Sequence, residues 1–152
     1  MKTLARQRDR EEILSRLRTV RSNSAARWGR MSAHQMICHL ADAFRMATGE
    51  KPTRPDTSLF RRLILKWIVL YAPLPWPPGI PTSPEIDQGI GGTRAEDFVA
   101  DLAETTRLLD VVSGPTVELE GRVHPYFGKM SHAVWLRWAY LHADHHLRQF
   151  GA

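Results

Sequence analysis

The residues best placed to do chemistry are two histidines near the C-terminus, His142 and His146. They are four positions apart, and side chains at that spacing stand about 5 to 6 Å apart on one face of a helix. Two imidazoles can then converge on one ion at about 2.0 to 2.1 Å from each nitrogen, as in metal-binding His-x-x-x-His helices. The same face carries Trp135 and Trp138, so it should point into the core. The pattern predicts a buried metal site.

A third ligand should come from a facing helix, because two ligands on one helix rarely hold an ion. A helical stretch much earlier in the chain, Ser32 to Thr48, contains His39, which shares a stripe with Met36 and Ala43. We therefore predict that His39, His142 and His146 bind one divalent ion. Three neutral imidazoles leave at least one coordination position for water or substrate, which is typical of catalytic rather than structural zinc sites.

Alternative interpretations stay open at this stage. A His-x-x-x-His without a central Glu recurs by chance, and a single core histidine is more often hydrogen-bonded to a protein neighbour than to a metal. Four further residues are candidates for orienting the ligands or lining a pocket: Gln35, Asp42, His124 and His145. His34 points away from His39 on the same helix, and we expect it to play no part in the site.

Helical periodicity provides the elements that would position these side chains. We predict five helical stretches: Ile13 to Val20, Ser32 to Thr48, Leu59 to Tyr71, Thr93 to Val112 and Ser131 to Phe150. Ser32 with Gln35, and Thr93 with Glu96, have the spacing of capping boxes at helix starts. Thr116 to Val123 is either an edge strand or a loop.

The expected fold is all-α, a four-helix bundle with a long Pro-rich crossover and an extra helical segment. Helices with one apolar stripe must bury it against one another, and four principal helices do so most simply as a bundle. Six prolines lie between Pro73 and Pro84. They cannot continue a helix and favour an extended, polyproline-like path. Leu59 to Tyr71 is too short and too charged to span a bilayer, so no membrane partner is expected.

Length and charge narrow the function classes. The 152 residues suit one domain over 1–152, and the single cysteine, Cys38, excludes an internal disulfide. The net charge is +5, with a basic excess in Met1 to Arg30. We rank nucleic-acid binding last, because no stacking aromatic is interleaved with the N-terminal arginines from Arg6 to Arg21. Met1 to Arg10 is charged and no apolar stretch follows it, which favours the cytoplasm over secretion.

Two blocks resemble the DinB-like (DinB/YfiT) superfamily of metal-dependent bundle proteins. They are RWGRMSAHQMICHLADAFRMATG, residues 27–49, and HPYFGKMSHAVWLRWAYLHADHHLRQFG, residues 124–151. Carried over residue by residue, the resemblance implies that His39, His142 and His146 hold zinc or nickel. It also implies an S-transferase or hydrolase that uses a low-molecular-weight thiol as co-substrate.

The sequence thus predicts a metal-dependent enzyme that acts on a small molecule. Such an ion lowers the pKa of a bound water or thiol toward neutrality. The competing interpretation is a non-catalytic bundle in which the metal only clamps two helices and the apolar Leu59 to Trp76 segment binds a partner or a second copy. A homodimer is expected from this segment.

Overall fold

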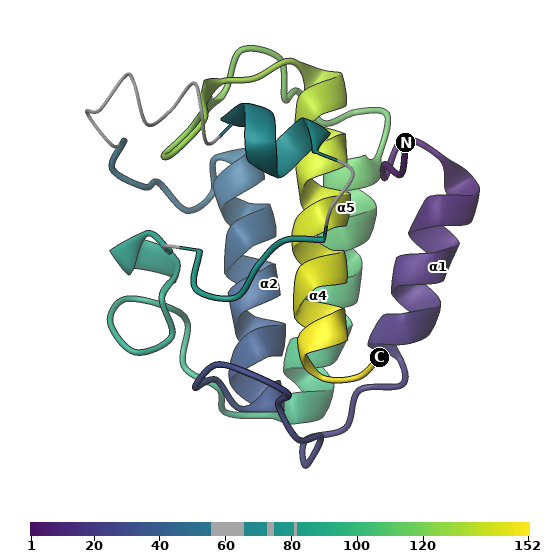
Figure 1. The fold of residues 1–152 in the computed structure, drawn as a ribbon, viewed down its shortest axis with the longest axis vertical. Coiled ribbons are helices and arrows are strands. Elements are labelled where there is room, and N and C mark those ends of the chain that lie inside the picture. The colour runs from purple at the N-terminus through teal and green to yellow at the C-terminus, as the bar shows by residue number, and fades with distance from the viewer. Residues whose placement is uncertain (56–65, 73–74, 81) are drawn as a thin grey trace.

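The computed structural model of the protein describes residues 1–55, 66–72, 75–80 and 82–152. Over these residues the chain is mostly helical, with one two-stranded sheet (Figure 1). The α-helices are α1 (Gln7–Leu17), α2 (Ala33–Thr48), α4 (Phe98–Ser113) and α5 (His132–Gln149), and residues 66–71 are also helical. A 3-10 helix, η1 (Pro84–Ile86), and the strands β1 (Val123–His124) and β2 (Gly128–Lys129) complete the described elements.

The two helices that carry the predicted ligands begin where the sequence indicates. Ser32 and Gln35 form a complete capping box at the start of α2, and Gly49 ends that helix with a left-handed φ of 84°. Ser131 caps α5 by accepting a hydrogen bond from the Val134 N–H. The predicted starts of both helices are confirmed. The capping residues of α2 and α5 therefore set where the two helices that carry the histidines begin.

The predicted start of the fourth helix at Thr93 is wrong. Helix α4 begins at Phe98, where the Asp97 carboxylate accepts hydrogen bonds from Val99 N and Ala100 N. Residues 93–97 are not helical, and the Thr93 N–H and hydroxyl donate to Asp42 instead, at 2.7 and 2.6 Å. Thr93 therefore takes part in a long-range contact with a buried carboxylate and not in a helix cap.

The segment between α2 and α4 agrees with the prediction only in part. Of the helix expected over Leu59 to Tyr71, residues 59–65 lie outside the described residues, and 66–71 are helical. Residues 75–77 of the Pro-rich segment have no regular structure, as expected, but Pro84 begins η1 instead of continuing an extended path. Proline suits the first position of a helical turn because the N–H it lacks would have no partner there.

An all-α fold was expected, but the chain also forms a small hairpin. Strand β1 pairs with β2 in antiparallel register, Val123 opposite Lys129 and His124 opposite Gly128. Of the stretch Thr116 to Val123, only the last residue belongs to a strand. Gly128 has a φ of 69°, which other residues rarely adopt, so the turn depends on it. The hairpin matters because it carries His124.

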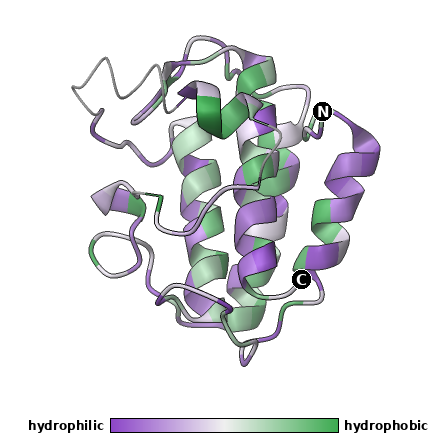
Figure 2. Ribbon diagram, in the orientation of Figure 1, coloured by the Kyte–Doolittle hydropathy of each residue, from purple (hydrophilic) through white to green (hydrophobic). Residues whose placement is uncertain are grey.

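The core lies between α2, α4 and α5, and α1 packs against α5 and α4 (Figure 1). Phe44 and Trp135 are among its largest fully buried side chains. Figure 2 shows that α1 is mostly hydrophilic and that α2 is more hydrophobic. Helix α1 buries few residues, chiefly Ile13 and Leu17. Within the described ranges, none of the helices combines the length and the apolar character needed to cross a bilayer.

Candidate metal centre and cavity

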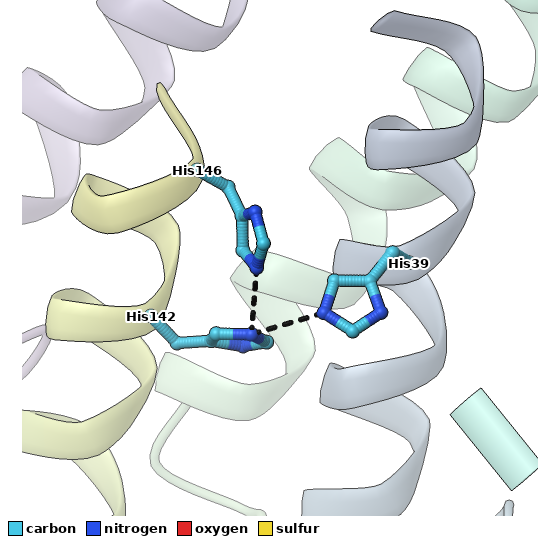
Figure 3. A group of neighbouring side chains, drawn as sticks. All are labelled: His39, His142 and His146. Atoms are coloured by element: carbon cyan, nitrogen blue, oxygen red, sulfur yellow. Dashed lines mark hydrogen bonds between the residues drawn. The ribbon is translucent and has the colours of Figure 1, made fainter. Parts of the chain in front are cut away.

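Three imidazoles from two helices meet inside the protein (Figure 3). His142 Nε2 lies 3.1 Å from His39 Nε2 of α2 and 3.1 Å from His146 Nε2 of α5. One ring nitrogen from each of the three histidines lies within 4.8 Å of the other two. The structure thus brings together the three histidines that the sequence predicts as ligands, each pointing the same ring nitrogen at a common point.

The outer nitrogen of two of these rings is held by an acceptor. His39 Nδ1 donates to the backbone oxygen of Ile86, at 2.8 Å, and His146 Nδ1 donates to Gln149 Oε1, also at 2.8 Å. Because a neutral imidazole carries one proton, a proton on Nδ1 leaves a bare lone pair on Nε2. Hydrogen bonds of this kind fix the tautomer and ring orientation of metal-ligating histidines.

His142 cannot satisfy both neighbours by hydrogen bonding. A proton on its Nε2 can be donated fully to only one of the two facing lone pairs, and Nδ1 would then be a bare acceptor. That Nδ1 is buried and has no hydrogen-bond partner among the described residues. A proton on Nδ1 would instead leave three lone pairs face to face. A divalent cation between the three Nε2 atoms would accept every lone pair.

The spacing and the electrostatics both fit a cation. Two nitrogens about 2.0 to 2.1 Å from one ion are about 2.9 Å apart at a right angle and about 3.4 Å apart at a tetrahedral angle. The observed 3.1 Å lies between these values. Burial lowers the pKa of His39, His142 and His146 below the ordinary value for histidine, which favours the neutral, metal-binding form.

The three rings form part of the wall of a cavity of about 480 Å³. Its other walls are rich in aromatic side chains: Trp28, Trp76, Tyr126, Phe127 and Trp138. The Trp138 ring stacks on His142 with centroids 5.0 Å apart and planes at 24°. A small apolar molecule in this cavity would therefore lie directly beside the three nitrogens.

The four flanking candidates differ in where they lie. Gln35, His124 and His145 line the cavity, although Gln35 Oε1 accepts a hydrogen bond from Ser32 N and so serves the helix cap. Asp42 neither lines the cavity nor bonds to a ligand ring. It is fully buried and binds Thr93, Gln88, Lys51 and Arg45 instead, so it fixes the loop that follows η1.

The groups that hold the ligand rings are ones that sequence reasoning missed. Gln149 was recognisable, because it lies three residues after His146 on the same face of α5. The Ile86 oxygen was not, because a backbone carbonyl has no sequence signature and reaches His39 only through tertiary packing. Gln149 Nε2 also donates to the Trp28 oxygen at 2.7 Å, which ties the segment before α2 to the site.

A second cluster of potential ligands contrasts with the first. His34 Nε2 lies 2.7 Å from Asp101 Oδ2, and the Cys38 thiol donates to the same oxygen at 3.5 Å. Burial, followed by the charge of Asp101, raises the pKa of Cys38 to about 12, so the thiol keeps its proton. Each donor here already has an acceptor, and the cluster calls for no cation. His34 lies in this cluster, away from the three ligand candidates.

Comparison with known proteins overturns the expected resemblance. A family model described as "Protein of unknown function (DUF1569)" matches residues 4–152. This family differs from the DinB-like superfamily, so the DinB/YfiT assignment is wrong. The assignment rested on motifs such as His-x-x-x-His, which are not specific to one family because metal-binding geometry imposes the same spacing on unrelated helices. No curated protein and no solved structure matches the chain at a significant level.

Proposed function

The chain belongs to the DUF1569 family, and from the geometry of its site we propose that it is a divalent-metal-dependent enzyme acting on a small molecule. In this proposal His39, His142 and His146 bind the ion, with zinc or nickel as the candidates that suit imidazole ligands. Water or substrate would reach the ion from the cavity that the three rings line. We further propose that helices α1, α2, α4 and α5 form a four-helix bundle, supported by the packing of α2 on α4 and of α1 on α5. The site lies between two of these helices, α2 and α5.

The proposal rests on the convergence of three Nε2 atoms. No arrangement of protons on the three neutral rings gives every one of these nitrogens and His142 Nδ1 a hydrogen-bond partner. A site that served only to hold two helices together would be expected to supply a fourth protein ligand and close the coordination shell. The described residues provide three ligands, and the fourth side borders the cavity. This arrangement favours catalysis over a purely structural role.

Three neutral imidazoles would leave a bound ion its full charge, and the chemistry that the ion would supply is a lower pKa for a bound water or thiol near neutral pH. The chain's own residues supply the rest. Gln149 and the Ile86 oxygen fix the His146 and His39 rings. Trp76, Trp138 and Phe127 provide the apolar surface that excludes water and positions a substrate. Among the candidate reactions, hydrolysis needs only the ion, water and the substrate, whereas a transferase also needs a second substrate.

Transfer to or from a low-molecular-weight thiol stays an untested prediction. It rested on the DinB-like resemblance, and no described residue of the cavity favours a thiol over water. The protein's own Cys38 is not an alternative thiol, because burial and Asp101 keep it protonated and it lies in the cluster with His34 and Asp101. A small-molecule thiol would therefore have to bind the ion itself.

Cobalt substitution tests the proposal. Co²⁺ in the three-histidine site should give visible absorption bands that change on titration with azide, because the coordination position facing the cavity accepts an added ligand. The His142→Ala variant should give no such bands. His34→Ala is the matched control, because it removes a histidine from α2 outside the site, and it should behave as the wild type. Bands that do not respond to azide would indicate a closed, structural site.

Removal of the metal with a chelator is a second test, and it asks whether the metal serves only to hold α2 and α5 together. The apolar core around Phe44 and Trp135 contains side chains from all four α-helices, so the metal-free protein should keep its helical circular dichroism and a cooperative unfolding transition. Loss of the fold on chelation would show that the metal acts as a clamp between α2 and α5.

A further inference from the structure

His124, at the end of β1, lines the cavity but belongs to neither the metal ligands nor the groups that hold them. Its side chain is only 4% exposed. The ring stacks on Phe127 with centroids 4.3 Å apart and planes at 16°, and its edge contacts Trp138 at 4.9 Å. The hairpin β1–β2 therefore places a polar ring within an aromatic wall.

The proton of this imidazole has a defined place. The Tyr126 backbone N–H donates to His124 Nδ1 at 3.1 Å, so Nδ1 is an acceptor and the single proton of the neutral ring is on Nε2. Burial lowers the pKa of His124 to about 3, which keeps the ring neutral at any pH near neutrality. His124 is thus a fixed hydrogen-bond donor through Nε2.

This donor has no acceptor among the residues that the structure describes. The polar side-chain atoms sealed inside the described protein without a partner are Glu85 Oε2, His142 Nδ1 and His145 Nδ1. His124 Nε2 is not one of these sealed atoms and bonds to none of the described residues, and the His124 ring lines the cavity. A buried N–H without an acceptor is unfavourable, so a ligand that offers one gains affinity there.

Trp138 connects this donor to the metal centre. Its ring centroid lies 4.9 Å from that of His124 and 5.0 Å from that of His142, so the centroids of the two histidine rings are less than 10 Å apart. A flat ligand lying against Trp138 would reach the metal centre at one end and His124 at the other.

We propose that the cavity binds a planar aromatic compound against Trp138, and that His124 Nε2–H recognises an acceptor oxygen of this compound, a carbonyl or a carboxylate. The inference rests on the proposed function for the reacting end of the molecule. His124 acts as a specificity-determining residue at the other end, because it favours molecules that carry an acceptor about one ring away from the reacting atom.

Binding of three simple probes to the metal-loaded protein, followed by tryptophan fluorescence, tests this inference. Toluene has the ring alone, acetophenone adds a neutral carbonyl, and benzoate adds a carboxylate. His124→Phe keeps a flat ring against Phe127 but removes the donor. The wild type should bind acetophenone or benzoate more tightly than toluene, and in His124→Phe this preference should fall about tenfold while toluene affinity is unchanged.

The comparison of the two oxygenated probes identifies the ligand chemistry. Tighter binding of benzoate that depends on His124 assigns a carboxylate, and tighter binding of acetophenone assigns a neutral carbonyl. The inference is overturned if His124→Phe retains the full preference, if toluene affinity falls equally, or if none of the probes binds. Elemental analysis of the same samples keeps the two proposals apart, because metal content should be unchanged in His124→Phe.

A measurement on the wild type covers the case in which the variant does not fold. Long-range ¹⁵N–¹H spectra should show His124 as the Nε2–H tautomer, and addition of acetophenone or benzoate should shift its Nε2 signal while toluene does not. A Nδ1–H tautomer, or an Nε2 signal that none of the probes shifts, would contradict the inference.

Discussion

At the scale of single residues, the site depends on groups that orient the ligand rings. Gln149 accepts the His146 Nδ1–H and donates to the Trp28 oxygen. Gln149→Leu removes the acceptor, so metal affinity measured by chelator competition should fall about 10- to 100-fold. Gln149→Glu keeps an acceptor oxygen and should stay within a few-fold of the wild type. Equal affinity in the wild type and Gln149→Leu would show that His146 needs no orienting partner.

The sequence was most informative at this scale. The i, i+4 spacing and the core-facing stripe place His142 and His146 on one face of α5, and a similar stripe places His39 on α2, so their meeting was predictable from periodicity. What each ring bonds to on its outer edge was not predictable. The Ile86 oxygen comes from a 3-10 turn, η1, that no sequence pattern indicated.

At the scale of elements, the loop after η1 is anchored by Asp42. This fully buried carboxylate receives hydrogen bonds from Thr93 and an ion pair from Lys51, with Nζ to Oδ2 at 2.9 Å. Asp42→Ala would leave these donors without a partner, and we expect a loss of about 3 kcal/mol in the free energy of unfolding, measured by urea denaturation.

Asp110→Ala is the matched control for Asp42→Ala, because Asp110 is an exposed aspartate of α4. It should change the free energy of unfolding by less than about 0.5 kcal/mol. Metal affinity should also fall in Asp42→Ala, because the loop fixes η1 and therefore the acceptor of His39 Nδ1. Similar stability of the two variants would contradict the anchoring role of Asp42.

The same contacts explain why one helix boundary could not be predicted from sequence. Ser32, Gly49 and Ser131 act on their own helices, so their signals are local and correct. Thr93 had the same local signal, but a carboxylate 51 positions earlier binds its N–H and hydroxyl. Long-range hydrogen bonds of this kind override local capping patterns.

At the scale of the whole molecule, acid stability should reflect the ion pairs of Glu104, one within α4 and one between α4 and α2. The Arg107 side chain, together with Arg45 of α2, lowers the pKa of Glu104 from its ordinary 4.5 to about 2. This stabilisation is complete above pH 4.5 and is lost as the pH falls toward 2. Urea unfolding of the wild type and Glu104→Gln should therefore differ at pH 6 and converge near pH 2. If the difference in free energy of unfolding between the two proteins is the same at pH 6 and pH 2, the ion pairs of Glu104 are not its source.

We also expect a homodimer through the exposed apolar residues of the helical segment 66–71. Trp67 is 68% exposed and Ile68 is 53% exposed. Trp67→Glu should halve the mass measured by light scattering, because a charge would have to be buried in the interface. Val99→Glu, at an exposed position of α4, is the control and should leave the mass unchanged. A monomeric wild type would remove this expectation.

Crystals of the metal-loaded protein, measured at the absorption edge of the bound metal, would show whether the three histidines hold an ion. We expect one anomalous peak about 2.0 to 2.2 Å from the Nε2 atoms of His39, His142 and His146. A peak between His34, Cys38 and Asp101 instead, or no peak in protein grown and purified with zinc and nickel, would contradict it.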